Sequence, residues 1–155
     1  MINNFKKIMV CLDGSKHSEK ALNQAIMIAK KFDSKITLIH VVEPSTVLGT
    51  IQSQVEPFWG SISGSILQNS LDKEQKEGNK ILTKNSSILG KEGISFDTKL
   101  LLGNPSEEIL NFSKKQKVGV IVVGNLGKGI LTRSLLGSVS TSISQKANCI
   151  VIIVR

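Results

Sequence analysis

The stretch VGVIVVGNLGKGILTRSLLGSVS, residues 118–140, decides the fold of this chain. A short apolar run at 120–123 passes into a loop with glycines at 124, 127 and 129, and apolar residues spaced by three and four follow from there to Ala147. A buried strand, a glycine loop and a helix start, in this order, are typical of parallel α/β sheets. Such loops present backbone N–H groups to phosphate at the carboxyl ends of the strands. The stretch therefore predicts an α/β protein with an anion-binding loop.

The residue types of this loop suit a phosphate ligand. Glycine permits positive φ and lets the backbone approach an anion without a Cβ in the way. Ser138 adds a hydroxyl donor near the helix start, and Lys128 and Arg133 add positive charges within reach of the loop. The free N–H groups of a helix's first turn stabilise a negative charge by roughly 0.3–1 kcal/mol when exposed and up to about 2 kcal/mol when partly buried. The loop is therefore expected to contribute part of a phosphate site.

Two common nucleotide signatures do not fit the glycine spacing. A Walker A motif requires GxxxxGK[ST], but Ile130 stands at the lysine position. A dinucleotide fingerprint requires GxGxxG, but Thr132 stands at the third glycine. What remains is Gly-x2-Gly-x9-Gly-Ser, at positions 124, 127, 137 and 138. A simpler interpretation, that these glycines only shape a strand-to-helix loop, stays open at this point.

The rest of the chain alternates strand and helix patterns. Ser18 is expected to cap the first helix, and Asn104 caps a later one with Pro105 at the first helical position. Five strands alternating with four helices predict an α/β fold with a doubly wound parallel sheet, in a single domain of residues 1–155. The expected strands cover residues 7–13, 35–42, 96–102, 120–123 and 150–155, and one expected helix covers residues 66–90.

Residues 44–65 differ from the rest. They hold two prolines and three glycines without a sustained period, which predicts a long flexible loop. The loop carries the only tryptophan, Trp59, beside Phe58. This pair is expected to pack on the body of the protein. Two other roles stay open, as a lid over the ligand or as a contact with a partner.

Composition and charge narrow the class of protein. The chain of 155 residues is 40% hydrophobic and 21% charged, and no apolar run approaches the roughly 20 residues that a transmembrane helix requires. With no signal-peptide pattern at its start, the chain is expected in the cytoplasm, without a membrane partner. The net charge of +8 permits nucleic-acid binding, but the lysines are scattered and aromatics are only 4%, so no stacking platform is available. We expect a solvated basic surface and no nucleic-acid partner.

No catalytic or metal constellation is evident in the sequence. Cys11 and Cys149 lie in or beside apolar strands without zinc spacing, which indicates small buried residues. His17 and His40 belong to no Ser–His–Asp order or HExxH motif, and His40 is expected to be a packed strand residue. We therefore expect no catalytic residues and no resident metal site.

The order of elements, the Asp-Gly-Ser after the first strand and the Gly-x2-Gly-x9-Gly-Ser loop together resemble a single-domain universal stress protein of the ATP-binding branch. The resemblance covers residues 7–155, and the glycine loop is its most specific part. It implies a five-stranded parallel sheet in the order 3-2-1-4-5 with helices on both faces, a Rossmann-like, adenine nucleotide alpha hydrolase-like fold. It also implies an ATP (or ADP or AMP) ligand that carries Mg²⁺, at most slow hydrolysis of ATP, and a regulatory, stress-response role.

The resemblance also assigns roles to residues. Asp13 matches the acid that binds the ribose hydroxyls, and the backbone of Val41 matches the group that reads the adenine edge. Gly103 lies where a further loop glycine borders the pocket. The complete predicted nucleotide site is Cys11, Leu12, Asp13, Val41, Gly103, Val123, Gly124, Gly127, Lys128, Gly137, Ser138 and Val139. Two simpler roles stay open, Asp13 as a cap of the following helix and Val41 as plain core.

Three positions depart from the family's pattern. Gly119 replaces an acid that commonly opens the fourth strand, and Asn125 replaces a Ser or Thr. Leu126 offers no charge where Arg or His is frequent, so contact with the terminal phosphate would rely on Lys128 or Arg133. The preference for ATP over AMP is the property that these departures leave open.

The resemblance further implies a homodimer in which the apolar strand from Ile150 to Arg155 pairs with its copy, because an apolar edge would otherwise invite aggregation. Two other classes stay open. One is a nucleotide-free dimeric interaction module. The other is an adenylate-transferring enzyme, which would carry an SGGxDS-like loop where this chain has DGSKHS at 13–18.

Overall fold

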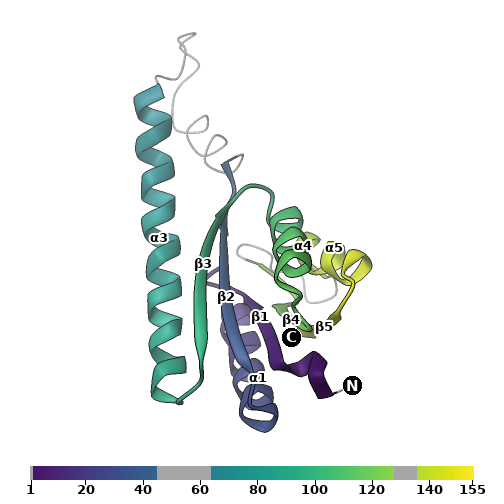
Figure 1. The fold of residues 1–155 in the computed structure, drawn as a ribbon. Coiled ribbons are helices and arrows are strands. Elements are labelled where there is room, and N and C mark those ends of the chain that lie inside the picture. The colour runs from purple at the N-terminus through teal and green to yellow at the C-terminus, as the bar shows by residue number, and fades with distance from the viewer. Residues whose placement is uncertain (1, 45–63, 128–135) are drawn as a thin grey trace.

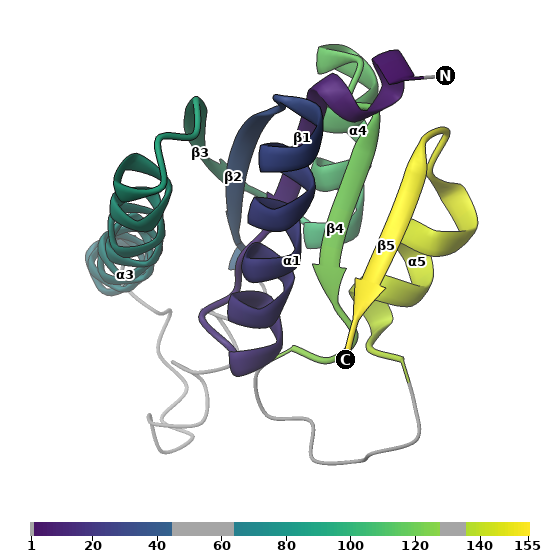
Figure 2. The ribbon, with the colours of Figure 1, turned by 90° about the horizontal axis from the view of Figure 1, so that it is seen from below.

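A five-stranded parallel sheet forms the middle layer of the molecule, with the strands in the order β3-β2-β1-β4-β5 (Figures 1 and 2). This computed structural model describes residues 2–44, 64–127 and 136–155. The predicted fold class and sheet order are confirmed. The strands are β1 Lys7–Cys11, β2 Lys35–Val42, β3 Phe96–Leu102, β4 Val120–Gly124 and β5 Ile150–Val154.

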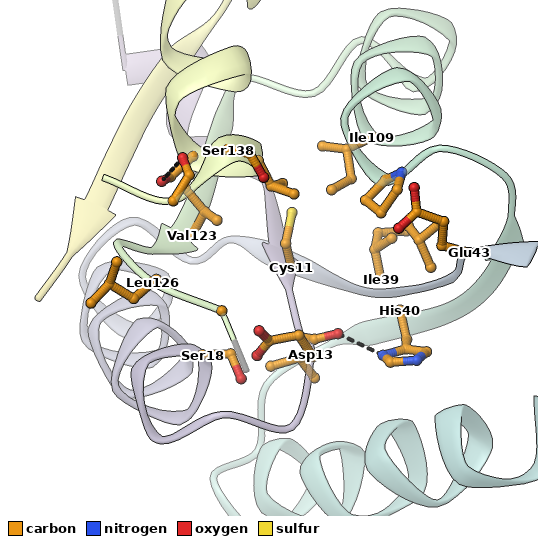
Figure 3. Close-up of a pocket in the computed structure, with 18 of the residues that line it drawn as sticks. Cys11, Asp13, Ser18, Ile39, His40, Glu43, Ile109, Val123, Leu126 and Ser138 are labelled. Carbon is orange, nitrogen blue, oxygen red and sulfur yellow. Dashed lines mark hydrogen bonds between the residues drawn. The ribbon is translucent and has the colours of Figure 1, made fainter. Parts of the chain in front are cut away.

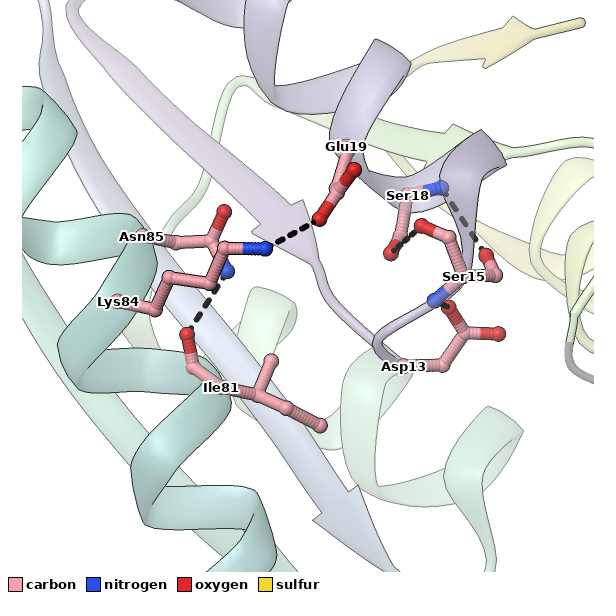
Figure 4. A network of polar contacts seen from close by, with 7 residues as sticks. All are labelled: Asp13, Ser15, Ser18, Glu19, Ile81, Lys84 and Asn85. Carbon is pink, nitrogen blue, oxygen red and sulfur yellow. Dashed lines mark hydrogen bonds and ion pairs between the residues drawn. The ribbon is translucent and has the colours of Figure 1, made fainter.

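Helices cover both faces of the sheet, as expected. The 3-10 helix η1 (Ile2–Lys6) precedes β1, and the four α-helices of the described residues are α1 Lys16–Phe32, α3 Gly64–Lys91, α4 Pro105–Gln116 and α5 Ser138–Lys146. Figure 2 shows α1 and α3 on one face, with α4 and α5 on the other. An ion pair of 2.7 Å between Lys84 and Glu19 joins α3 to α1 (Figure 4).

The central strands β1, from Ile8 on, and β4 are apolar because both of their faces are buried. Successive side chains alternate between the two faces. Ile8 and Val10 of β1 pack with the core residues of α1 and α3, whereas Met9 and Cys11 pack with those of α4 and α5. Every residue of β4 is buried. Polar side chains are thereby kept out of β4 and out of β1 after Lys7, and they occur at the residues that follow these two strands.

The helix starts differ in part from the prediction. Asn104 caps α4 and accepts a hydrogen bond from the Glu107 N–H at 3.2 Å, as expected, with Pro105 in the first turn. The expected Ser18 cap of α1 is wrong: Ser15 caps this helix, and its hydroxyl accepts the Ser18 N–H at 3.1 Å. Helix α1 begins earlier because the Asp-Gly-Ser turn already folds the chain back onto the sheet.

Helix α3 follows the predicted stripe and extends slightly beyond residues 66–90. Leu82 and Leu89 are buried against the sheet, while Leu67 and Leu71 in the first turns are only half-buried. The helix ends before Gly93, whose φ of 68° suits glycine. Trp59 and the other residues of 45–63 lie outside the described residues, so the loop prediction remains a prediction. No helix in the described part of the chain is long and apolar enough to cross a membrane.

Candidate functional site

A cavity of about 380 Å³ opens at the carboxyl ends of β1, β2 and β4 (Figure 3). Strand β1 has β2 on one side and β4 on the other, so the chain connections leave the sheet in opposite directions at β1 and β4. Ligands of open α/β sheets bind at such a switch point, outside the carboxyl ends of the strands. The volume falls within the range of about 300–1,000 Å³ that is usual for small-molecule sites.

The structure brings ten of the twelve predicted site residues to this cavity. Gly103 is not among the lining residues, and Lys128, like Arg133, lies outside the described residues. Gly103 instead has a structural reason: its φ is 147°, and its N–H donates to the Val42 carbonyl at 3.0 Å where β3 passes into α4. The ten lining residues are Cys11, Leu12, Asp13, Val41, Val123, Gly124, Gly127, Gly137, Ser138 and Val139.

The carboxylate of Asp13 lies between the start of α1 and the glycine loop. One oxygen, Oδ1, accepts the Ser15 N–H at 2.9 Å (Figure 4). The other oxygen, Oδ2, lies beside Gly127, where an added Cβ would come within 3.0 Å of it. Asp13 thus supports the capping residue Ser15 without being the helix cap itself. It is half-buried at the cavity wall, where a carboxylate can accept hydrogen bonds from a polyol.

The glycines at 124 and 137 are required for a reason that the sequence did not indicate. A Cβ on Gly124 would lie 2.8 Å from the backbone carbon of His17, so this glycine lets α1 approach β4 closely. A Cβ on Gly137 would point at the Asn125 carbonyl, 3.2 Å away. In both cases the missing side chain makes room for this protein's own backbone. Of these three glycines, only Gly127 would direct an added Cβ at a residue predicted to bind the ligand, Asp13.

The start of α5 presents backbone N–H groups at the cavity. Gly137 is the N-cap and offers no side-chain cap, and the first intrahelical bond runs from the Thr141 N–H to the Gly137 carbonyl at 2.9 Å. The N–H groups of the three preceding residues therefore have no partner within the helix. Ser138 and Val139, in this first turn, line the cavity. This helix end carries a partial positive charge that favours an anion.

Hydrogen bonds fix this helix start to the end of β4. The Gly137 N–H donates to the Asn125 carbonyl at 2.7 Å, and the Ser140 hydroxyl lies 3.0 Å from the same oxygen. Asn125 in turn donates its N–H to the Val154 carbonyl at 2.8 Å. The two ends of the glycine loop are thus held together by backbone groups, although residues 128–135 between them are outside the described part.

The floor of the cavity is apolar. Cys11, Ile39 and Ile109 are buried there, and Figure 3 shows the Cys11 sulfur directed toward the space between Ser138 and Ile109. Burial, with a smaller effect of the nearby Asp13 charge, raises the pKa of the Cys11 thiol to about 12. Cys11 is therefore a neutral thiol at physiological pH and acts as an apolar surface rather than as a nucleophile.

Several lining residues were missed by the sequence analysis. Glu43 follows β2 directly, so its place at a strand end could have been noticed. Glu74 comes from α3, and no sequence signal places it here because its position depends on how α3 packs. The half-buried His40 donates a hydrogen bond from Nδ1 to the Leu12 carbonyl at 2.7 Å. Within the described residues, no group of three or more His, Cys, Asp or Glu side chains is placed to hold a metal ion.

Comparisons of the sequence with known proteins point to one family. A family model described as Universal stress protein family matches residues 4–155. Universal stress protein MJ0531 of Methanocaldococcus jannaschii is 36% identical over 153 residues, which cover 99% of this chain and 84% of the relative. Universal stress protein YxiE of Bacillus subtilis is 35% identical over 156 residues, which cover 97% of this chain and 99% of the relative.

Solved structures share the whole fold. Universal stress protein UspA from Lactobacillus plantarum superposes with a TM-score of 0.82 at 22% identity, covering 97% of this chain and 98% of that one. A universal stress protein from Archaeoglobus fulgidus in complex with dAMP has a TM-score of 0.67 at 24% identity, covering 96% and 97%. At these identities the likeness shows a common fold.

Proposed function

The chain belongs to the universal stress protein family, and we propose that it binds an adenine nucleotide, with ATP as the expected ligand, in the cavity at the carboxyl ends of β1, β2 and β4. The observation that carries the proposal is the convergence of three different features on one cavity. These are the Asp13 carboxylate, the apolar floor and the uncapped start of α5. A nucleoside phosphate has a polyol, a flat apolar base and an anionic end, which match these features in kind.

The phosphates belong at the start of α5. The unpaired N–H groups of its first turn and the positive helix end suit an anion, in the manner of other phosphate-binding helix starts. Ser138 can add its hydroxyl, because its side chain is exposed at this edge. We assign the additional charge for the terminal phosphates to Lys128 or Arg133.

The ribose belongs beside Asp13, and the base belongs on the apolar floor. A carboxylate can accept from both hydroxyls of the ribose diol. Val41 at the end of β2 lines the same cavity, where its backbone can pair with the polar edge of adenine. The family member from Archaeoglobus fulgidus in complex with dAMP supports an adenine nucleotide as the class of ligand for this fold.

The expected role is a cytoplasmic, stress-linked regulatory protein that responds to nucleotide occupancy. The only cavity-lining acids besides Asp13 are Glu43 and Glu74 among the described residues, and we assign neither a catalytic role. Mg²⁺ would enter with the triphosphate and keep water ligands, as is usual for this ion on nucleotides. Hydrolysis of ATP, if measured, is expected to be slow.

We also propose a homodimer formed through β5. This strand ends the row of strands, and its first residue, Ile150, is 37% exposed. Pairing of two β5 strands would cover this apolar edge, which a single copy leaves open to other chains. Equilibrium sedimentation tests the dimer. Ile153→Pro should dissociate it if the strand provides the contact, because the N–H groups that bond to β4 belong to the alternate residues and the Ile153 N–H faces the open edge.

The proposed ligand is tested by isothermal titration of the purified protein with ATP, ADP and AMP in the presence of Mg²⁺, together with mass spectrometry for co-purified nucleotide. Micromolar binding of an adenine nucleotide is the expected result. Failure of all three nucleotides to bind would favour the nucleotide-free interaction module, in which the glycine loop has only a structural role.

A further inference from the structure

We propose that His40 is a positioning residue for the ribose site: its imidazole holds the Leu12–Asp13 peptide and thereby sets the direction of the Asp13 side chain. This inference rests on the proposed nucleotide function, because Asp13 is there assigned to the ribose. His40 itself is expected to act through Asp13, without a contact to the ligand.

Both peptide groups that flank Leu12 are hydrogen-bonded to β2. The Leu12 N–H, in the peptide before this residue, donates to the Ile39 carbonyl at 2.8 Å, and the Leu12 carbonyl, in the peptide after it, accepts the His40 Nδ1–H at 2.7 Å. Since a carbonyl oxygen only accepts, Nδ1 carries the proton in this contact. The regular pairing of β1 with β2 ends at Cys11 and Ile39. The His40 ring therefore extends the pairing by one peptide unit, to the carbonyl that is bonded to the nitrogen of Asp13.

The ring of His40 is kept in place by α3. Gly78 of this helix is buried, and an added Cβ there would lie 2.5 Å from Cδ2 of His40 and 2.6 Å from Cδ1 of Leu100. The ring thus occupies the space that a side chain on Gly78 would need. This close approach fixes the imidazole between α3 and the end of β1, so that its Nδ1 faces the Leu12 carbonyl.

The face of the sheet on which the His40 side chain lies favours a role in positioning Asp13 over a direct contact with the ligand. Ile39 and Cys11 belong to the core under α4 and α5, whereas Leu38 and Leu12 belong to the core under α1 and α3. His40 follows Ile39 and points to the α3 side. Figure 3 shows its ring directed to the end of β1 and away from Ser138 and Ile109. The ring therefore borders the cavity at the end of β1, on the α3 side of the sheet and away from the start of α5.

Asp13 is then held from two directions. The backbone before it is fixed by the His40 ring, and its Oδ1 accepts the Ser15 N–H at 2.9 Å. Loss of the first contact frees the Leu12 carbonyl and lets the peptide rotate, which turns the carboxylate away from the ribose hydroxyls. A ligand without these hydroxyls does not depend on that direction.

The test compares ATP with 2′,3′-dideoxy-ATP by isothermal titration of the wild-type protein, His40→Leu and His40→Asn. We expect His40→Leu to lose about tenfold in affinity for ATP, the usual effect of one lost hydrogen bond, with the affinity for dideoxy-ATP unchanged. His40→Asn should restore ATP binding, because its Nδ2 donor takes the place of Nδ1. Equal losses for both ligands, or full ATP affinity in His40→Leu, would overturn the assignment.

A second pair of variants tests the same contact without changing His40. Gly78→Ala should displace the ring and selectively weaken ATP binding. Gly90→Ala is the matched control in the same helix, since no atom of the described part of the chain lies within 4 Å of its added Cβ. Gly78→Ala binding both ligands as the control does would contradict the role of the ring position. A wild-type protein that binds neither ligand would instead refute the proposed function, and this assignment with it.

Discussion

The same substitution at two glycines of one motif is expected to change two different properties, the stability of the fold in one case and the affinity for ATP in the other. Gly124 and Gly127 both line the cavity, and each has ordinary backbone angles that alanine can adopt. A methyl group on Gly124 would lie 2.8 Å from the backbone carbon and 3.0 Å from the backbone oxygen of His17. Among the described residues, a methyl group on Gly127 would meet only the Oδ2 atom of Asp13, at 3.0 Å.

The neighbour that must move determines the magnitude. For Gly124→Ala, the first turn of α1 has to shift from the sheet, and forcing an extra carbon into a packed contact costs typically about 1–3 kcal/mol. For a chain of this length, Tm falls by roughly 2–4 °C for each kcal/mol of lost stability, hence by about 2–12 °C. For Gly127→Ala, the far end of a flexible carboxylate moves, so the free energy of unfolding should change by less than about 0.5 kcal/mol. Its effect falls on the ligand, because the carboxylate is turned from the ribose.

Thermal unfolding followed by circular dichroism measures the first effect, and isothermal titration with ATP at a temperature where both variants are folded measures the second. Gly124→Ala should melt early, whereas Gly127→Ala should melt like the wild-type protein and bind ATP more weakly by about 1–3 kcal/mol, the usual cost of a lost charged hydrogen bond. Equal melting temperatures of the two variants would refute the separation of a packing glycine from a site glycine.

Three further predictions concern the site and the fold. Asp13→Asn keeps an acceptor for the Ser15 N–H but removes the charge, so titration should show ATP binding weakened by about 1–3 kcal/mol without a lower Tm; unchanged affinity would remove Asp13 from the site. Burial raises the pKa of Cys11 from 9.0 to about 12, so the thiol loses its proton at a lower pH in the unfolded chain than in the folded one. The free energy of unfolding of the wild-type protein, relative to Cys11→Ala, should therefore be constant below pH 9 and fall above it by up to about 1.4 kcal/mol per pH unit. Urea unfolding of both proteins measures this, and parallel pH profiles would contradict it. Gly119→Ala places its Cβ 1.7 Å from the Asn4 carbonyl oxygen, so we expect a loss of at least about 1–3 kcal/mol as η1 is displaced, and a wild-type melting curve would show that η1 does not depend on this contact.

Much of the fold could be predicted from local patterns. The apolar runs found all five strands, most clearly β4, in which every residue is buried, and the capping residues Asn104 and Pro105 marked the start of α4. Periodicity did not give the order of the strands, which came from the family resemblance. The start of α1 was misplaced because Ser15 and Ser18 both suit an N-cap, and only the turn made by the Asp13 carboxylate selects between them.

The sequence predicted which residues line the cavity better than it predicted what each of them does there. The glycine spacing located Gly124 and Gly137 at the cavity, but their missing side chains make room for His17 and for the Asn125 carbonyl. Such close approaches join residues that are distant in the sequence, so a one-dimensional pattern cannot assign them. The same holds for Glu74, whose place at the cavity depends on the packing of α3.

Burial of the sheet explains why backbone groups dominate this candidate site. Side chains within β1 and β4 face apolar cores and have no access to a polar ligand. Polar contacts must therefore come from the first residue after a strand that can carry charge, Asp13, and from peptide groups of the loop and of the α5 start. A site built from peptide groups tolerates many side-chain changes but is sensitive to any contact that sets the plane of a peptide. On this reasoning we expect the loss of the hydrogen bond from His40 to the Leu12 carbonyl, which is remote from the proposed phosphate position, to weaken nucleotide binding about as much as the loss of a direct ligand contact.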